Sequence, residues 1–244
     1  TMEFEVELKG SGGAGNAPAL GKLLKACGFG EAVVESTSVT YTPASTGISS
    51  LTIGLYNDGV RYQIQGARGT VSLRLEKGKP GRLRFVFTGA EYAVADVAMF
   101  SSGVSYETSK PQPFLAAAFS IDSYQALVGS LEFNMANEVV LRDSVNAASG
   151  HLSAVIAGRQ PTLSLDPEMV TVAIYDWFTK LKTGHEGALT TTLGATAGNI
   201  CTITAPKVQY TGIRVADKSG LRSLGVDCQL NRNAGDDELS IVFT

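Results

Sequence analysis

Charged residues are scarce in this sequence, and they do not form the clusters that nucleic-acid-binding surfaces need. They make up 18% of the 244 residues, against 44% hydrophobic residues, and the formal net charge is −3. A protein that neutralises phosphates gathers lysine and arginine on one surface. The composition therefore argues against a strong nucleic-acid binder and favours a globular chain with an extensive shielded surface.

Residues that bind metals or form disulfides are also few. Cys27, Cys201 and Cys228 are an odd set without CxxC spacing, which predicts reduced, mostly buried thiols in a protein made in a reducing cytosol. His151 and His185 lie in polar, turn-like settings without a second ligand at metal spacing. We therefore predict no metal site and no cofactor.

Long hydrophobic runs are missing as well. No run reaches the length of a transmembrane helix, and no signal peptide is visible, so we predict no membrane association. The chain begins with Thr1 rather than methionine, which leaves open an excised fragment and a preceding targeting segment.

Motifs for catalysis are weak. Gly10-x-Gly12-x-x-Gly15 satisfies the dinucleotide fingerprint, and Glu35 follows about twenty residues on. However, the strand before it alternates with glutamates, whereas the first strand of a doubly wound fold is buried on both faces. Only two convincing helices are found, too few to cover a parallel sheet. We predict that the protein is not an enzyme, and keep a nicotinamide-cofactor enzyme as an alternative.

The dominant positive feature is the stretch from Gly59 to Phe87. Its apolar residues alternate with polar ones, which places them on one face of an antiparallel sheet. These residues are Ile64, Val71, Leu73, Leu75, Leu83, Phe85 and Phe87. The stretch from Gly198 to Val226 repeats the plan at a constant offset of 139, although few identities are involved and chance stays an alternative.

Both stretches follow a predicted helix. The first helix covers residues 18–27, with Asn16 as its N-cap and Gly28 as its left-handed stop. The second begins at Asp166-Pro-Glu and ends at Gly184. Its apolar stripe consists of Val170, Ile174, Trp177, Phe178 and Leu181. These patterns predict a mainly β fold with two short helices.

Strands are predicted on both sides of each helix. In the first half they cover residues 4–8, 38–42, 51–56, 60–65, 70–76 and 82–88, and in the second half 130–134, 139–142, 152–157, 162–165, 189–193, 200–204, 207–210, 222–229 and 239–243. The scattered arginines Arg61, Arg68, Arg74, Arg82 and Arg84 are interpreted as partners in cross-strand pairs or subunit contacts.

The order of strand, helix and several strands occurs twice, which predicts two tandem units. We place the first unit at residues 1–89, a connector at 90–118 and the second unit at 119–244. Residues 125–160 of the second unit have no counterpart in the first. We therefore expect the first unit to lack its N-terminal strands.

Several segments resemble the major tail tube proteins of long-tailed, siphovirus-type bacteriophages. They are APALGKLLKACGF (17–29), YNDGV (56–60), GARGTVS (66–72), TAPKVQ (204–209) and GDDEL (235–239), spread over nearly the whole chain. The resemblance implies β-sandwich or barrel units, each with a flanking helix, in rings that stack into a conduit for DNA ejection. It implies a virion tail location, after synthesis in the bacterial host cytoplasm, with itself and other phage tail proteins as partners.

The predicted duplication also implies how many chains form one ring. Two units per chain predict a ring of three chains with pseudo-sixfold symmetry, closed by heterologous contacts. The conduit should let DNA pass without specific binding. Candidate lumen-facing residues are Ser72, Glu132 and Asn134, and candidate ring-stacking residues are Gly12, Gly13, Ser45, Thr46, Asn146 and Ser149.

Two further functions stay open at this point. A related tail component of the same fold, such as a distal-tail hub or terminator ring, would form one ring only. A carbohydrate- or ligand-binding β-sandwich module would need exposed aromatic side chains beside a cleft. Trp177, the single tryptophan, is predicted to be buried.

Overall fold

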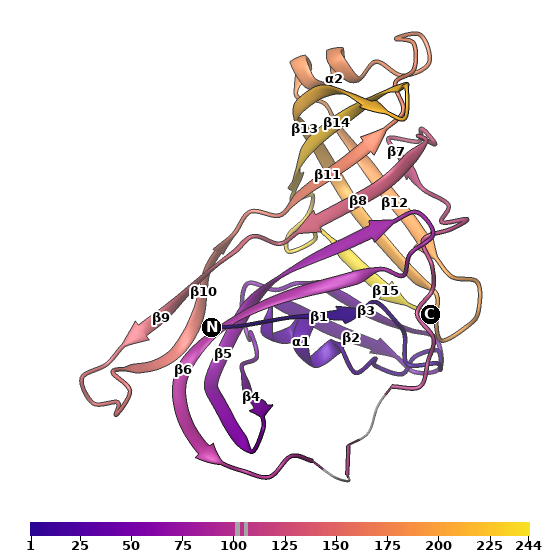
Figure 1. The fold of residues 1–244 in the computed structure, drawn as a ribbon. Coiled ribbons are helices and arrows are strands. Elements are labelled where there is room, and N and C mark those ends of the chain that lie inside the picture. Colours follow the sequence, from indigo (N-terminus) through magenta and orange to yellow (C-terminus); the bar gives the residue numbers. More distant parts are fainter. Residues whose placement is uncertain (101–102, 105–106) are drawn as a thin grey trace.

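Antiparallel strands make up most of the computed structural model, which describes residues 1–100, 103–104 and 107–244 (Figure 1). The strands are β1 (Met2–Glu7), β2 (Phe29–Val34), β3 (Ser38–Pro43), β4 (Leu51–Asn57), β5 (Val60–Glu76), β6 (Arg82–Asp96), β7 (Ser120–Ile121), β8 (Val128–Asn134), β9 (Asn137–Asp143), β10 (His151–Arg159), β11 (Thr162–Pro167), β12 (Glu186–Leu193), β13 (Cys201–Lys218), β14 (Leu221–Asn231) and β15 (Ser240–Phe243). The helices described are α1 (Gly21–Ala26) and α2 (Trp177–Thr183). The predicted mainly β fold with two helices is confirmed.

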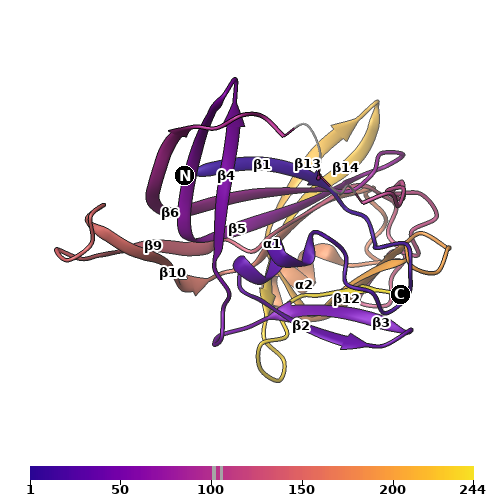
Figure 2. The same ribbon diagram turned by 90° about the horizontal axis from the view of Figure 1, so that it is seen from below.

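One long sheet contains most of these strands, in the order β1-β6-β5-β8-β11-β14-β13-β15-β3-β2. In addition, β4 pairs with β5, and β12 pairs with β13 and β7. The strands β9 and β10 form a separate two-stranded hairpin that extends away from the rest (Figure 2). Every pair between named strands is antiparallel, as the alternating sequence pattern predicts.

The alternation buries one face of the sheet. Val71, Leu73 and Leu75 on β5, and Leu83, Phe85 and Phe87 on β6, are all buried, and Ile64 joins the same core. Leu131 and Phe133 of β8 continue this face across the register of β5. A single hydrophobic cluster therefore contains residues from both ends of the chain.

Two pairs of predicted strands are continuous strands. Residues 60–65 and 70–76 belong to β5, and residues 200–204 and 207–210 belong to β13 except for Ile200. In β5 the join is a bulge, because the register with β6 shifts between Gln65 and Arg68 and Gly66 has a φ of 57°. Strand β6 continues to Asp96 rather than ending at Thr88, so it crosses the predicted unit boundary. Strands β2 and β7 were not predicted.

Helix α1 is shorter than predicted. It starts after Leu20, which makes no side-chain capping bond, so Asn16 is not its N-cap. The backbone N–H of Gly21 donates to the carbonyl of Pro18 at 2.9 Å, so residues 18–20 form a turn before the helix. Gly28 has a φ of 83°, and the predicted left-handed stop is confirmed.

Helix α2 begins much later than predicted, with Asp176 as its N-cap. Asp166 and Pro167 end strand β11 instead. The Asp166 carboxylate accepts hydrogen bonds from the backbone N–H groups of Gly129 and Ser130, at 2.7 and 2.6 Å, which ties it to β8. The predicted stripe is broken as well, because Ile174 is 61% exposed whereas Trp177 is 1% exposed. Gly184 ends the helix in the left-handed conformation, as predicted.

The same strand order occurs twice along the sheet. Strand β1 pairs with β6 and β6 with β5, just as β11 pairs with β14 and β14 with β13. The second edge of β5 carries β4 up to Ala67 and then β8 from Ser72 to Glu76.

The corresponding edge of β13 is only partly occupied. It carries β12 up to Gln209, and no strand in the described part of the chain pairs with it from Thr211 to Lys218. The gap-free offset of 139 does not hold through both strands of the hairpin. Phe85 pairs with Val71, whereas Leu224 pairs with Val215 rather than with Tyr210.

Candidate functional site

The face of the sheet opposite the core is polar, and it contains the three residues predicted to face a lumen. Ser72 of β5 lies opposite Asn134 of β8, and Arg74 lies opposite Glu132. Because successive side chains of a strand alternate between faces, these residues share the side away from buried Leu73 and Phe133. The structure thus brings Ser72, Glu132 and Asn134 together on two neighbouring strands.

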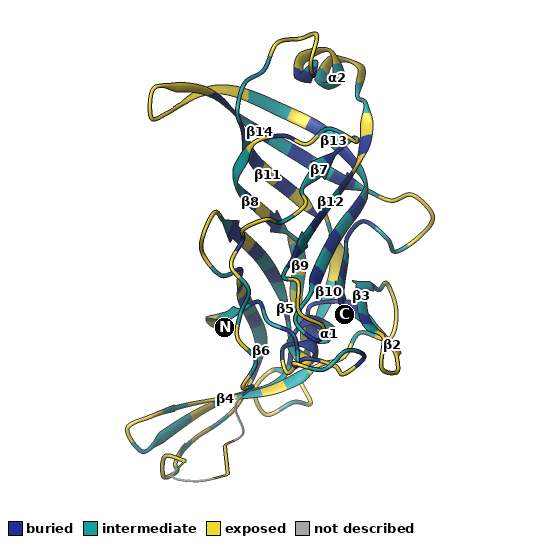
Figure 3. Cartoon of the chain, turned by 90° about the vertical axis from the view of Figure 1, so that its right-hand side faces the viewer, coloured by how far each residue is buried: buried dark blue, intermediate teal, exposed yellow. Residues whose placement is uncertain are grey.

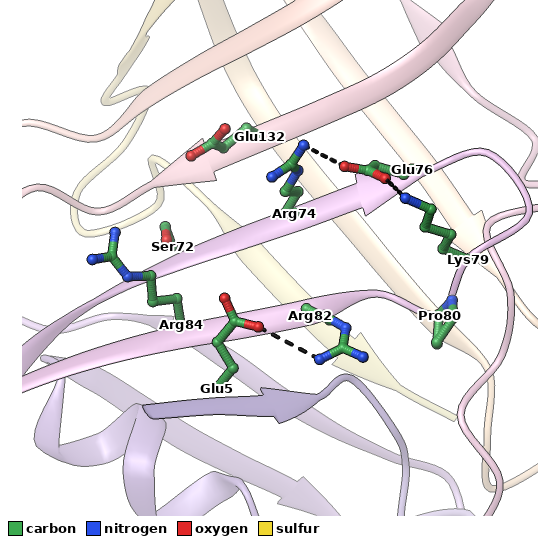
Figure 4. Close-up of a pocket in the computed structure, with 9 residues that line it drawn as sticks. All are labelled: Glu5, Ser72, Arg74, Glu76, Lys79, Pro80, Arg82, Arg84 and Glu132. Atoms are coloured by element: carbon green, nitrogen blue, oxygen red, sulfur yellow. Dashed lines mark hydrogen bonds and ion pairs between the residues drawn. The ribbon is translucent and has the colours of Figure 1, made fainter. Parts of the chain in front are cut away.

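A shallow depression on this polar face is lined almost entirely by charged side chains (Figure 4). Arg82 of β6 lies 3.5 Å from the Glu5 carboxylate, and Arg84 lies 2.6 Å from that of Glu3. On β5 and its turn, Arg74 and Lys79 both contact Glu76. The cross-strand pairing predicted for the arginines is confirmed for Arg82 and Arg84, whose partners lie on β1.

These ion pairs neutralise the cations of the face. Lys79 donates a hydrogen bond to Glu76 and Arg74 adds its charge, and together they lower the pKa of that carboxyl. Further along the sheet, Lys218 contacts Asp166 and Arg214 contacts Asp227. Phosphates approaching this face would therefore meet arginines whose charge is already balanced by neighbouring carboxylates.

A second polar cluster lies at the base of the β9–β10 hairpin. Arg159, at the end of β10, contacts Asp236 at 2.6 Å and the buried carboxylate of Glu238 at 3.1 Å. Ser45 donates both its backbone N–H and its hydroxyl to Asp236. The hydrogen bonds from Ser45, followed by that from Arg159, lower the pKa of Asp236 to about 2. The sequence pattern did not predict that Arg159 pairs with Glu238, because the two residues are far apart in the chain.

The residues predicted for ring stacking occupy different places. Ser45 is held by this cluster and Thr46 is exposed next to it, whereas Asn146 and Ser149 lie in the loop that joins β9 and β10. The backbone N–H of Gly12 donates to Gly198 at 3.1 Å, and Gly13 packs against the same glycine. A Cβ on Gly198 would lie only 2.3 Å from the carbonyl carbon of Gly12, so this contact requires glycine.

Polar contacts with Asp122, directly after strand β7, hold the C-terminal part of helix α2. The Asp122 carboxylate contacts Lys180 at 2.5 Å and His185 at 2.8 Å. The hydroxyl groups of Tyr175 and Tyr210 lie 2.7 Å apart beside it. The rings of Tyr175 and Tyr210 pack against Trp177, which is buried as predicted. The single tryptophan is therefore not exposed for a sugar to stack on.

The described residues also bear on whether the chain has a metal site, a reactive cysteine or a membrane-spanning helix. Among them there is no group of His, Cys, Asp and Glu side chains that could hold a metal ion. Cys27, Cys201 and Cys228 are free and buried, and burial raises the pKa of each thiol, to about 12 for Cys201. Within the same residues, no helix is long and apolar enough to cross a membrane.

Comparison with known proteins gives one family. The family model described as phage tail tube protein matches residues 2–228. A search of the curated proteins found no match. The matched range includes the repeated strand order, the polar face and the β9–β10 hairpin. The chain belongs to the phage tail tube protein family.

Proposed function

We propose that this protein is the repeating structural subunit of a siphovirus-type tail tube, built from stacked rings that conduct DNA during ejection. In this proposal it has no enzymatic role and no cofactor, and its partners are copies of itself and other phage tail proteins. The observation that carries the proposal is the continuous antiparallel sheet with two strand edges that are unpaired among the described residues, the outer edge of β1 and the edge of β13 from Thr211 to Lys218.

The repeated strand order supports two tandem units per chain. Assigning β6 wholly to the first unit moves the end of that unit from residue 89 to Asp96, while the second unit begins near residue 119. Inside the chain, β8 lies between β5 and β11 and joins the two halves. An equivalent joint between chains would extend the same sheet around a ring, which removes the unpaired strand edges.

The strand directions show whether β13 of one chain could pair directly with β1 of the next. Every neighbour in the series β1-β6-β5-β8-β11-β14-β13 is antiparallel, so β1 and β13 run in the same direction. Direct pairing of β13 with β1 of the next copy would therefore be parallel. One additional strand between them, placed as β8 is inside the chain, makes the ring antiparallel throughout. Three chains then supply six units in a closed heterologous ring.

The polar face with Ser72, Glu132 and Asn134 is the surface that we assign to the lumen. Its arginines are paired with carboxylates, which suits passage of DNA without specific binding because few counterions would be released from the phosphates. The loops that contain Gly12, Gly13, Ser45, Thr46, Asn146 and Ser149 are proposed as ring-stacking regions.

Light scattering combined with negative-stain electron microscopy tests the assembly. We expect rings with three chains each that stack into tubes of variable length. Six chains per ring would contradict the duplicated subunit. A single ring that never stacks would favour the distal-tail hub or terminator instead, since those components do not polymerise.

Charge neutralisation at the lumen is tested by the double variant Glu3→Gln and Glu5→Gln, which frees Arg84 and Arg82. We expect it to bind short duplex DNA measurably at low salt, with a log–log salt slope steeper by up to about 1.8 for two phosphates. The matched control, Glu35→Gln with Glu138→Gln, changes the net charge equally but removes no carboxylate of this face. Equal DNA binding by both variants would contradict the assignment.

A further inference from the structure

The two ends of the long strands present different surfaces. Strand β5 has 17 residues, which corresponds to about 50 Å if fully extended at about 3.3 Å per residue, and the bulge at Gln65–Arg68 shortens that distance. Its N-terminal end belongs to an arm formed with β4 and the end of β6, and its C-terminal end leads into the turn at residues 77–81. The arm and the turn thus lie at opposite ends of strands β5 and β6 (Figures 1 and 3).

The arm carries an exposed apolar row. Leu55 of β4 pairs with Tyr62 of β5, which pairs with Val94 of β6. Their side chains are 56%, 44% and 58% exposed, and Tyr92 beside them is 59% exposed. Three apolar residues in one cross-strand row form a contiguous patch rather than the scattered exposure that is usual on monomers. We call this row, with Tyr92, the arm face.

The tip of the arm is acidic. Asp58 lies in the β4–β5 turn and Asp96 ends β6 next to it, paired with Val60. Both are exposed, and no ion pair to either is found among the described residues.

An apolar groove lies at the other end of the sheet, beside the β5–β6 turn. Leu115, the alanines 116–118 and Leu127 line it, and Leu115 and Leu127 are 52% and 65% exposed. Lys77 is its charged lining residue, and it is exposed at the rim. Backbone bonds from Gly78 to Phe114 and from Phe114 to Lys79 fix the groove to the turn.

We propose that the arm face of one copy docks into this groove on a second copy of the chain, along the strand axis. Both surfaces are exposed and apolar, and the acidic arm tip complements Lys77 at the groove rim. A contact between two different surfaces of the same chain is heterologous, and when it acts along an axis it repeats without closing. This inference rests on the proposed tube and names one contact between consecutive rings, in addition to the proposed ring-stacking loops.

Site-directed crosslinking tests the contact. Chains with Val94→Cys and chains with Leu127→Cys are mixed and treated with a short bis-maleimide, because the three natural cysteines are buried. We expect crosslinked dimers in the mixture and few with either variant alone, since the two surfaces differ. Val33→Cys, which is 52% exposed on β2, replaces Val94→Cys as the matched control and should give no dimers with Leu127→Cys.

Other outcomes overturn the inference. Efficient dimers of Val94→Cys alone would indicate a symmetric arm–arm contact. Crosslinking of Leu127→Cys to Val145→Cys, at the exposed β9–β10 loop, but not to Val94→Cys would assign the groove to the other hairpin. If light scattering shows tubes and neither crosslink forms, the groove contact is wrong while the tube stands. If the chain stays monomeric at millimolar concentration, both proposals fail.

Charge exchange gives a second test. Lys77→Glu should weaken assembly at low salt, and Asp96→Lys should weaken it similarly. Mixing the two variants should restore assembly to within a few-fold of the original protein, because the reversed charges meet across the contact. Absence of rescue, with both variants folded by circular dichroism, would contradict the proposed contact.

Discussion

At the scale of single residues, buried and exposed ion pairs have different consequences for stability. Arg159 is 9% exposed and contacts Glu238, which is 3% exposed, whereas the Arg214–Asp227 pair is solvent-accessible. Exposed pairs contribute little because water and salt screen them. Removing one member of a buried pair leaves a desolvated charge.

Arg159→Ala should therefore destabilise the protein by about 3 kcal/mol, measured by urea denaturation. The matched control, Arg214→Ala, should cost less than about 1 kcal/mol. Similar losses for both variants would show that Glu238 is compensated by Arg232 alone, which also contacts it at 2.9 Å.

The same cluster predicts an acid-sensitive contribution to stability. The pKa of Asp236 falls from its ordinary value of 3.8 to about 2 in the folded protein, chiefly through Ser45 and then Arg159. A lowered folded pKa adds stability above the unfolded pKa that disappears as pH falls through the folded one. The difference in unfolding free energy between the original protein and Asp236→Asn should therefore have its largest value above about pH 5. It should decrease between about pH 4 and pH 2. A pH-independent difference would contradict this assignment.

At the scale of secondary structure, helix α2 depends on an N-cap at Asp176, whereas the sequence pattern predicted a helix start at Asp166. The Asp176 side chain accepts a hydrogen bond from the backbone N–H of Thr179 at 2.9 Å. Asp166 looked like the better start because proline follows it, but its carboxylate binds β8. A helix-start pattern and a strand end can thus share the same residues.

Asp176→Ala should cost about 1 kcal/mol of stability because it removes the N-cap bond. Asn16→Ala is the matched control, since Asn16 was predicted to cap α1 and does not. It should change the unfolding free energy by less than about 0.5 kcal/mol. The two variants are compared by thermal and urea denaturation. An equal loss of unfolding free energy for both would contradict Asp176 as the N-cap of α2.

At the scale of the whole molecule, the two proposed units share one sheet and one core. Strand β5 pairs with β8, and β3 pairs with β15, so each half contributes strands to the other. Trp177 reports on the second half alone. Its fluorescence and the far-ultraviolet circular dichroism, which reports on all strands, should therefore follow one coincident unfolding transition.

Phe133→Ala tests this coupling, since Phe133 is 1% exposed on β8 at the junction and its loss should cost about 3 to 5 kcal/mol. Both signals should shift together. Two separated transitions, with circular dichroism changing before Trp177, would show that the units unfold independently.

Local sequence patterns specify which residues face the core, because alternation depends only on local strand geometry. They also determined the mainly β class, the two helix stops at Gly28 and Gly184, and the buried position of Trp177. These features depend on backbone preferences and on hydrophobic patterns within a few residues.

Which strands became neighbours depends on contacts between segments that are distant in the chain. Alternation specifies a face but not a partner, so Ser72 beside Asn134, or Tyr41 beside Ile241, depends on pairing between distant segments. The Arg159 cluster and the groove beside the β5–β6 turn arise in the same way. Their residues are separated in the chain and meet only once the sheet has formed, and so do the two incomplete edges on which the proposed ring depends.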